Sequence, residues 1–188
     1  MTATKVDERR AIRPPSEAGA PKIAVGGDGV TNAGVHIRQL GVSDLPAVEQ
    51  HLLRLGPSDR CARFLSYPAD AMITSYVRGI DPSCTVLVGA FDQSGRMVGM
   101  AEAHLSGGPC PVEVAVSIDP SLRRHGLGQR LVARALALAF ARGALSAEFV
   151  FAPANRALAA LVQALGGHLT APGHALINRA TDRGDAAA

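Results

Sequence analysis

The sequence predicts one α/β domain of the α+β kind, in which helices flank a mixed, mostly antiparallel sheet of about seven strands. Two short turn segments, 92–95 and 172–173, each separate two strand-like runs by the length expected of a β-hairpin. Between them, a Val- and Ile-rich run at 112–118 leads through a glycine-containing loop into a helical pattern at 126–142. The predicted order of elements is β, α, α, β, β, β, α, β, α, β, β.

Local patterns justify each element in turn. Residues 35–40 alternate apolar and polar side chains as a strand does, and Ser43 with Asp44 offers an N-cap for a helix at 45–55. The remaining predictions are a short helix ending near residue 65, a helix at 71–77, strands at 85–91, 97–104 and 146–151, a helix beginning at Asn155, and a closing hairpin at 168–179.

The length of 188 residues fits one domain with two tails. Residues 1–34 combine charges, prolines and glycines with few large apolar groups, so we expect a flexible N-terminal tail. Residues 35–180 form the predicted domain, and residues 181–188 a second flexible tail.

Composition argues against several classes of protein. Lys and Arg number 19 against 16 Asp and Glu, no basic block stands out, and aromatic residues are too few to stack on bases, so we expect no nucleic-acid partner. No signal peptide and no apolar run of about 18 residues is found, so we expect no membrane partner. Cys61, Cys84 and Cys110 match no disulfide or metal-binding spacing, which favours free thiols in the cytoplasm and no metal.

The segment 123–131, which reads RRHGLGQRL, predicts an anion site. Gly126 and Gly128 lack the Cβ atoms that would keep a backbone away from a ligand, and the first amides of the following helix are free to bind phosphate. Arg123 or Arg124 can add a charge-assisted contact. The segment could also be a plain helix start whose glycines serve packing. It lacks the third glycine of the dinucleotide fingerprint and the Gly-Lys-Ser/Thr of a nucleoside-triphosphate loop.

The motif Arg123-x-x-Gly126-x-Gly128 resembles the central motif of the GNAT superfamily of acyl-CoA-dependent N-acyltransferases. The similarity extends from about residue 35 to residue 177. It includes His36-Ile37-Arg38 at the start, 44–47 at the first helix, and Asn155 with Leu165-Gly166 at the last helix.

The resemblance implies a sheet that splays between strands 112–118 and 146–151, with acetyl-CoA as the acyl donor lying in the gap. Backbone groups of Val116 and Ile118 would bond the pantetheine, the amides of residues 124–129 the pyrophosphate, and Asn155 the cosubstrate near its thioester. The expected contacts are therefore Val116, Ile118, Arg123, Arg124, His125, Gly126, Leu127, Gly128, Gln129 and Asn155.

Glu113 is the first candidate for the general base, because an amine must lose a proton before it attacks a thioester. An acid flanked by valines is either a surface carboxylate or a base turned into a cleft, and the corresponding Glu is often the base in similar bacterial protein-lysine acyltransferases. Glu102 is the alternative, although an exposed structural role suits it better. His104 could relay a proton or lie at the surface, and His125 would serve through its backbone.

The expected activity is N-acetyl transfer to a primary amine, on a small molecule or a protein lysine, by a monomer or homodimer. Many family members carry a Tyr where this chain has Val162, so no side chain is assigned to protonate the leaving thiolate. The stretch 55–60 with Arg63-Phe64 is similar to bacterial protein-lysine acyltransferases. The alternative is a non-catalytic acyl-CoA sensor. The only lysines, Lys5 and Lys22, lie in the predicted tail, so any self-acylation would be confined to it.

Overall fold

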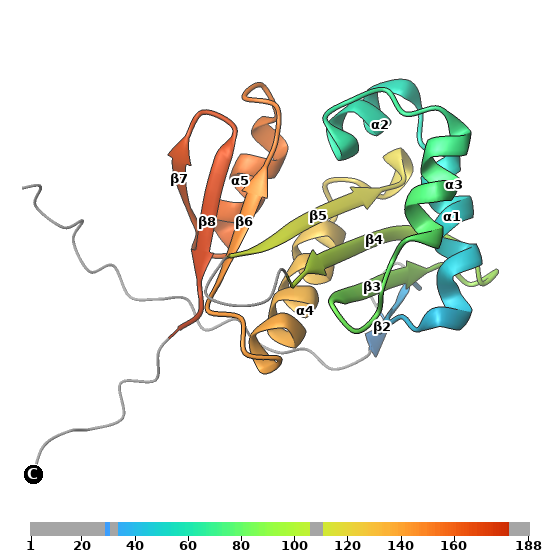
Figure 1. Cartoon of the computed structure of the whole chain (residues 1–188), viewed down its shortest axis with the longest axis horizontal. Helices are drawn as coiled ribbons and strands as arrows, with labels where there is room; N and C mark the ends of the chain where they lie inside the picture. The colour runs from blue at the N-terminus through green and yellow to red at the C-terminus, as the bar shows by residue number, and fades with distance from the viewer. Residues whose placement is uncertain (1–28, 31–33, 106–110, 181–188) are drawn as a thin grey trace, which may run out of the picture.

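The computed structural model describes residues 29–30, 34–105 and 111–180, which contain one eight-stranded sheet (Figure 1). The strands are β1 (Gly29–Val30), β2 (His36–Gln39), β3 (Thr85–Phe91), β4 (Met97–His104), β5 (Val112–Ile118), β6 (Ser146–Val150), β7 (His168–Ala171) and β8 (His174–Asn178). The helices are α1 (Leu45–Leu53), α2 (Pro57–Phe64), α3 (Asp70–Arg78), α4 (Leu127–Ala141) and α5 (Arg156–Ala164).

The strand order is β1-β2-β3-β4-β5-β6-β8-β7, and every neighbouring pair is antiparallel except β5 and β6, which are parallel. This confirms the predicted fold class. The seven predicted strands are present, and β1 adds a short eighth within the range predicted as a tail. Most of both predicted tails, and Cys110, lie outside the described residues.

Helices cover both faces of the sheet, so the central strands are buried on both sides (Figure 1). On one face, α4 packs with the inward side chains of β3 to β6 around Leu131, Leu136 and Phe149. On the other face, α1 and α3 enclose a second cluster around Leu52, Ile73 and Met100. None of the described helices has the length and apolar character needed to cross a membrane.

A buried histidine joins α1 to the far end of β5. His51 is fully buried, with Nε2 at 2.9 Å from Ser117 Oγ and Nδ1 at 3.5 Å from Asp119 Oδ1. Burial lowers the pKa of His51 to about 4, more than the nearby Asp119 carboxylate can offset. The imidazole is therefore neutral near pH 7, and it fixes Ser117 between the two β5 residues predicted to face the cosubstrate.

The parallel pair β5 and β6 stays together for only two residue pairs, Val112 with Ala147 and Glu113 with Glu148. Beyond Glu113 the two strands diverge toward their carboxyl ends (Figure 1). The sheet is therefore open on one side of β5, at the position where the sequence places the cosubstrate.

Candidate active site

The backbone of β5 presents hydrogen-bonding groups to this opening, although the Ile118 carbonyl already accepts from the Arg123 guanidinium. The Asp119 N–H donates to the Val98 carbonyl of β4 at 2.9 Å. Because successive residues of a strand direct their N–H and C=O groups to opposite sides, Val116 and Ile118 direct theirs away from β4. These are the two residues whose backbone was expected to bond the pantetheine.

The loop between β5 and α4 has the backbone of an anion site. Arg124 and Gly126 both have positive φ, 65° and 76°, and Gly126 is the N-cap residue of α4. The first intrahelical bond of α4 that involves this residue runs from the Arg130 N–H to the Gly126 carbonyl. The N–H groups of residues 127–129 therefore have no acceptor within the helix. The first turn carries no acidic side chain that would repel an anion.

Gly126 and Gly128 serve different purposes. Gly126 needs its positive φ, and a Cβ there would meet open space. At Gly128 a Cβ would lie 3.1 Å from Leu161 Cδ1 and 3.3 Å from Ile118 Cδ1. The packing of α4 against α5 and β5 therefore favours a small residue at Gly128, which agrees with the alternative that this glycine serves packing.

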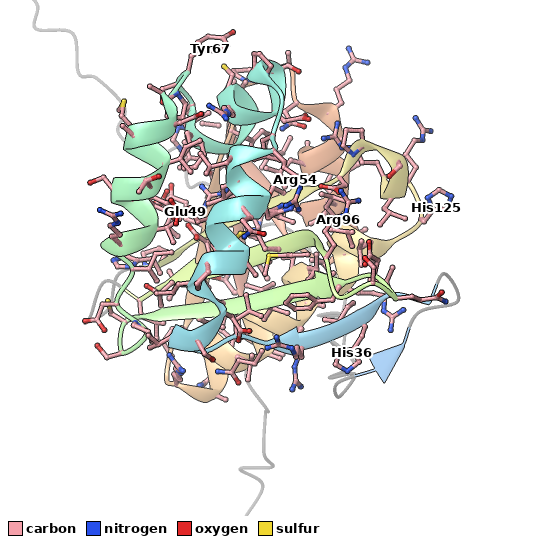
Figure 2. The ribbon with its side chains drawn as sticks, turned by 90° about the vertical axis from the view of Figure 1, so that its right-hand side faces the viewer. His36, Glu49, Arg54, Tyr67, Arg96 and His125 are labelled. Atoms are coloured by element: carbon pink, nitrogen blue, oxygen red, sulfur yellow. The ribbon has the colours of Figure 1, made fainter. Side chains whose placement is uncertain are left out.

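The two arginines that open the loop are distinguished by their contacts. The Arg123 guanidinium donates to the Ile118 carbonyl from Nε and Nη2, at 3.1 and 3.0 Å, and forms a 2.8 Å ion pair with Asp59 of α2. Arg124 is exposed and has no ion-pair partner among the described residues. His125 is also exposed and projects outward from the loop (Figure 2). Arg124 is thus the arginine free to meet a phosphate.

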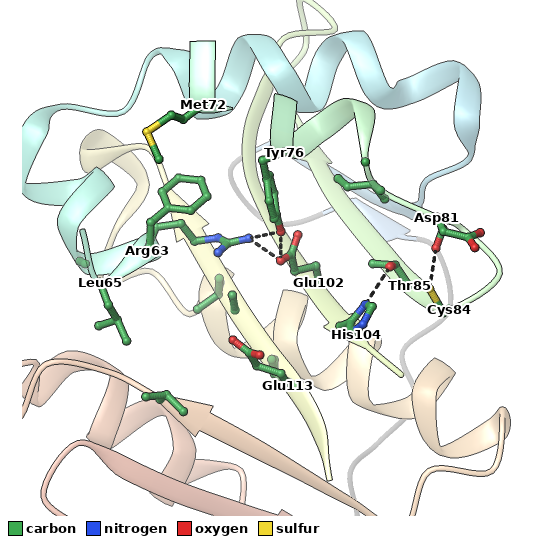
Figure 3. Close-up of a pocket in the computed structure, with 18 of the residues that line it drawn as sticks. Arg63, Leu65, Met72, Tyr76, Asp81, Cys84, Thr85, Glu102, His104 and Glu113 are labelled. Atoms are coloured by element: carbon green, nitrogen blue, oxygen red, sulfur yellow. Dashed lines mark hydrogen bonds and ion pairs between the residues drawn. The ribbon is translucent and has the colours of Figure 1, made fainter. Parts of the chain in front are cut away.

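A cavity of about 620 Å³ lies between the sheet and the helices α2 and α3 (Figure 3). Val116 of β5 and Val150 of β6 line it, so the cavity is continuous with the gap between the diverging strands. Cys84, Thr85 and Leu158 contribute to other parts of its wall. An extended ligand in the gap would therefore have one end in this cavity.

Glu113 lines the cavity and its side chain is exposed. It has no ion-pair partner among residues 34–105 and 111–180. Directly opposite it in the antiparallel pairing stands His104 of β4, and both side chains face the same cavity (Figure 3). The His104 Nδ1 lies 3.3 Å from the Thr85 hydroxyl. Glu113 is therefore both exposed and part of the cavity wall, so the geometry is compatible with a surface carboxylate and with a base that faces the cleft.

Glu102, the alternative base, belongs to a buried network that the sequence did not indicate. Its carboxylate lies 2.5 Å from Arg63 Nη2 and accepts a hydrogen bond from the Tyr76 hydroxyl (Figure 3). Arg63 also donates to the Tyr76 oxygen at 3.0 Å and stacks on Phe64. Burial is the main cause that raises the pKa of Tyr76 well above its usual value. The expectation that Glu102 is exposed was wrong, because only 8% of the residue is accessible.

Helical spacing could have predicted that Tyr76 lies on the inward side of α3, since it falls three residues after the buried Ile73 and one before the buried Val77. Its partner could not, because 26 residues separate Tyr76 from Glu102.

A search with protein-family models matches residues 50–166 to the acetyltransferase (GNAT) family. The chain belongs to the GNAT family. Acetyl transfer is the activity of that family, and the resemblance found in the Arg123-x-x-Gly126-x-Gly128 motif is confirmed. No match of comparable significance is found among curated protein sequences.

Solved structures with the same fold include several GNAT enzymes. The GNAT domain of PAT from S. lividans is 16% identical, with a TM-score of 0.63 over 77% of this chain and 90% of that chain. A phosphinothricin acetyltransferase from Sinorhizobium meliloti, solved with acetyl-CoA, is 20% identical, with a TM-score of 0.61 over 77% and 88%. Spermidine N-acetyltransferase from Vibrio cholerae, solved with CoA and spermine, is 16% identical, with a TM-score of 0.58 over 78% and 96%.

Two positions of the last helix bear on GNAT chemistry. The Asn155 side chain caps α5 by accepting from the Leu158 N–H at 3.1 Å, so its carboxamide oxygen is already used and its NH₂ group remains for a ligand. Val162, where many GNAT members carry a Tyr, is fully buried in the core. The helix therefore supplies no proton donor at this position.

Proposed function

We propose that this protein transfers an acetyl group from acetyl-CoA to a primary amine by direct attack within a ternary complex. The observation that carries the proposal is the continuity between the open gap of β5 and β6 and the cavity that holds Glu113, since Val116 and Val150 line both. A thioester at the end of an extended donor in the gap would meet an amine that enters from the cavity.

Binding of acetyl-CoA would use the backbone more than side chains. The backbone of Val116 and the N–H of Ile118, whose carbonyl is bonded to Arg123, would pair with the pantetheine amides as a further strand would. The amides of residues 124–129 would bind the pyrophosphate, with Leu127 and Gln129 contributing from the first turn of α4. Arg124 would add a charge-assisted contact. Asn155 would donate to the donor near its thioester.

Glu113 would act as the general base. An amine arrives as an ammonium ion at neutral pH, and Glu113, directly or through one water, takes one proton. The nitrogen lone pair then attacks the thioester carbonyl carbon, and a β5 amide can stabilise the resulting oxyanion. Collapse breaks the C–S bond and expels the CoA thiolate, and the second nitrogen proton goes to solvent. Water then protonates the CoA thiolate, because the side chain of Val162 carries no proton to donate.

Glu102 is a poorer base because its carboxylate is held by Arg63 and Tyr76, and protonating it would break a buried ion pair. We further propose a cytoplasmic location, which suits the free thiols of Cys61 and Cys84.

The proposal is tested by measuring CoA release from acetyl-CoA with a panel of small primary amines and lysine peptides, with acetylated products identified by mass spectrometry. We expect amine-dependent CoA release and a product about 42 Da heavier than its acceptor, because an acetyl group replaces one hydrogen of the amine. Tight acetyl-CoA binding without transfer to any member of the panel would contradict the proposal and favour the alternative of a non-catalytic acyl-CoA sensor.

A further inference from the structure

The cavity combines acidic lining residues with exposed apolar side chains at its edge. Among the described residues, six large hydrophobic side chains are exposed. Three of them, Leu65, Tyr67 and Met72, fall within eight consecutive positions that cover the loop after α2 and the first turn of α3. Leu65 is 50% exposed, Tyr67 75% and Met72 61%. We call these three residues the mouth patch. The other three, Val42, Leu145 and Leu169, are scattered along the chain.

The mouth patch is continuous with the cavity. Leu65 and Met72 both line it. In Figure 3 Met72 lies above Arg63 and Leu65 below it, Glu113 lies low in the centre of the view, and His104 and Asp81 lie to its right. Tyr67 follows Leu65 by two residues and lies at the outer end of the molecule (Figure 2). A molecule that entered past these side chains would therefore meet Glu113 inside.

Leu65 gains little from the folded protein itself. It ends α2 with a φ of 53°, the left-handed region in which a Cβ costs free energy that glycine avoids. Half of its surface remains in water, so burial offsets only part of that cost. A leucine at this position is better accounted for by an apolar group that covers it from outside the chain.

The charged residues that line the cavity favour a cation. Three carboxylates, Asp81, Glu102 and Glu113, and a single guanidinium, Arg63, are found among the described lining residues. Glu102 and Arg63 neutralise each other, and the Ser83 amide holds the pKa of Asp81 below its usual value. Asp81 and Glu113 are therefore left as uncompensated acids, which attract an ammonium group and repel a carboxylate attached close to it.

We propose, on the basis of the acetyl transfer proposed above, that the acceptor is a polypeptide lysine flanked by apolar residues. A lysine side chain carries its ammonium on four methylenes, which can lie against Leu65 and Met72 while the nitrogen reaches Glu113. The neighbouring apolar side chains of the peptide cover the mouth patch. A polyamine would place further charges against apolar side chains, and a free amino acid would bring its carboxylate toward Asp81 and Glu113.

The test compares three N-acetylated, C-amidated heptapeptides with one central lysine, flanked on both sides by leucine, by glycine or by aspartate. We expect kcat/KM to be about tenfold higher for the leucine peptide than for the glycine peptide, since part of two apolar side chains is buried, and lowest for the aspartate peptide. Leu65→Gly and Met72→Ser are expected to bring the leucine-to-glycine ratio close to one.

Leu65→Gly also places a glycine at a backbone position with positive φ, where a Cβ is unfavourable. We therefore expect the melting temperature of this variant to be equal to or higher than that of the wild type. Loss of peptide preference in this variant cannot then be attributed to misfolding. Leu169→Ser, an equally exposed leucine on β7, is the matched control and should keep the wild-type ratio.

A wild-type protein that acetylates small amines but none of the peptides, or that treats the three peptides alike, overturns this inference and leaves acetyl transfer intact. A ratio that survives both Leu65→Gly and Met72→Ser overturns it as well. Absence of transfer to every amine and peptide overturns this inference together with the proposed function.

Discussion

His104 and Glu113 are direct cross-strand partners in the antiparallel pairing of β4 with β5, and both line the acceptor cavity. Two groups able to hold a proton thus stand side by side, and only one is proposed as the base. Their separate contributions can be measured, because the two side chains differ in their contacts: His104 is bonded to the Thr85 hydroxyl, whereas Glu113 has no ion-pair partner among the described residues.

Replacing His104 should have a small effect. In His104→Gln we expect kcat to fall by less than about fivefold with the acetyl-CoA dissociation constant unchanged, because a neighbour of the base contributes far less than the base's own factor of about 100 or more. Steady-state kinetics at saturating acetyl-CoA, with calorimetric measurement of acetyl-CoA binding, check this. A loss of 100-fold in kcat would instead make His104 the base or an obligatory relay.

The two arginines of the loop should separate cosubstrate binding from structure. Arg124→Ala is expected to weaken acetyl-CoA binding by about tenfold at low salt and less at high salt, as expected for a partly screened contact with a phosphate. Arg123→Ala should weaken it less, because its guanidinium is already bonded to Asp59 and the Ile118 carbonyl. Calorimetric titrations at two salt concentrations measure both, and the opposite ranking would show that Arg123 meets the phosphate.

His51 predicts how stability depends on pH. Its folded pKa of about 4 lies below the value of about 6.5 expected in the unfolded chain, so the unfolded state binds more protons between these limits. The contribution of His51 to the free energy of unfolding should be fully present above pH 6.5. It should be lost as the pH drops toward 4, which lowers the free energy of unfolding by about 3 kcal/mol. Urea unfolding of the wild type and His51→Gln between pH 4 and 7 isolates this contribution, because glutamine does not titrate. Parallel pH profiles would show that His51 is not responsible.

The chain's own two lysines offer an internal comparison for acceptor choice. Lys22 stands between Pro21 and Ile23, whereas Lys5 is followed closely by Asp7 and Glu8. After incubation with acetyl-CoA we expect more acetylation at Lys22 than at Lys5, because apolar neighbours suit the mouth patch. Peptide mass spectrometry measures both sites, with the N-terminal α-amine scored separately. Equal modification of the two lysines, or modification of neither by a protein active on peptides, would contradict the prediction.

Elements with strong local patterns could be predicted from the sequence almost residue by residue. The bounds of β3, β4 and β5 coincide with the predicted strands, because largely apolar runs bounded by turn residues leave little choice. The position of Glu113 on β5 followed from the same pattern. Its exposure to a cavity did not, because that depends on how α2 and α3 lie above the sheet.

Long-range partners were beyond local patterns. Asp44 was expected to serve as an N-cap. It does precede α1, but it makes no side-chain capping bond to that helix. Its carboxylate bonds the Arg38 guanidinium and the Gly41 N–H, and the second bond caps the short 3-10 helix Val42–Asp44 instead. The contacts of Arg63 with Glu102 and of Arg123 with Asp59 join residues far apart in the chain. No spacing rule identifies such pairs before the fold brings the strands and helices together.

Glu113→Gln is the most direct test of the account. Glutamine keeps the size and a hydrogen-bonding oxygen but cannot take a proton from the amine. We predict that kcat falls by about 100-fold or more, as expected for loss of a general base, while the acetyl-CoA dissociation constant measured by calorimetry stays within a factor of about two. If Glu113→Gln transfers acetyl groups at the wild-type rate and binds acetyl-CoA normally, the assignment of Glu113 as the base is wrong.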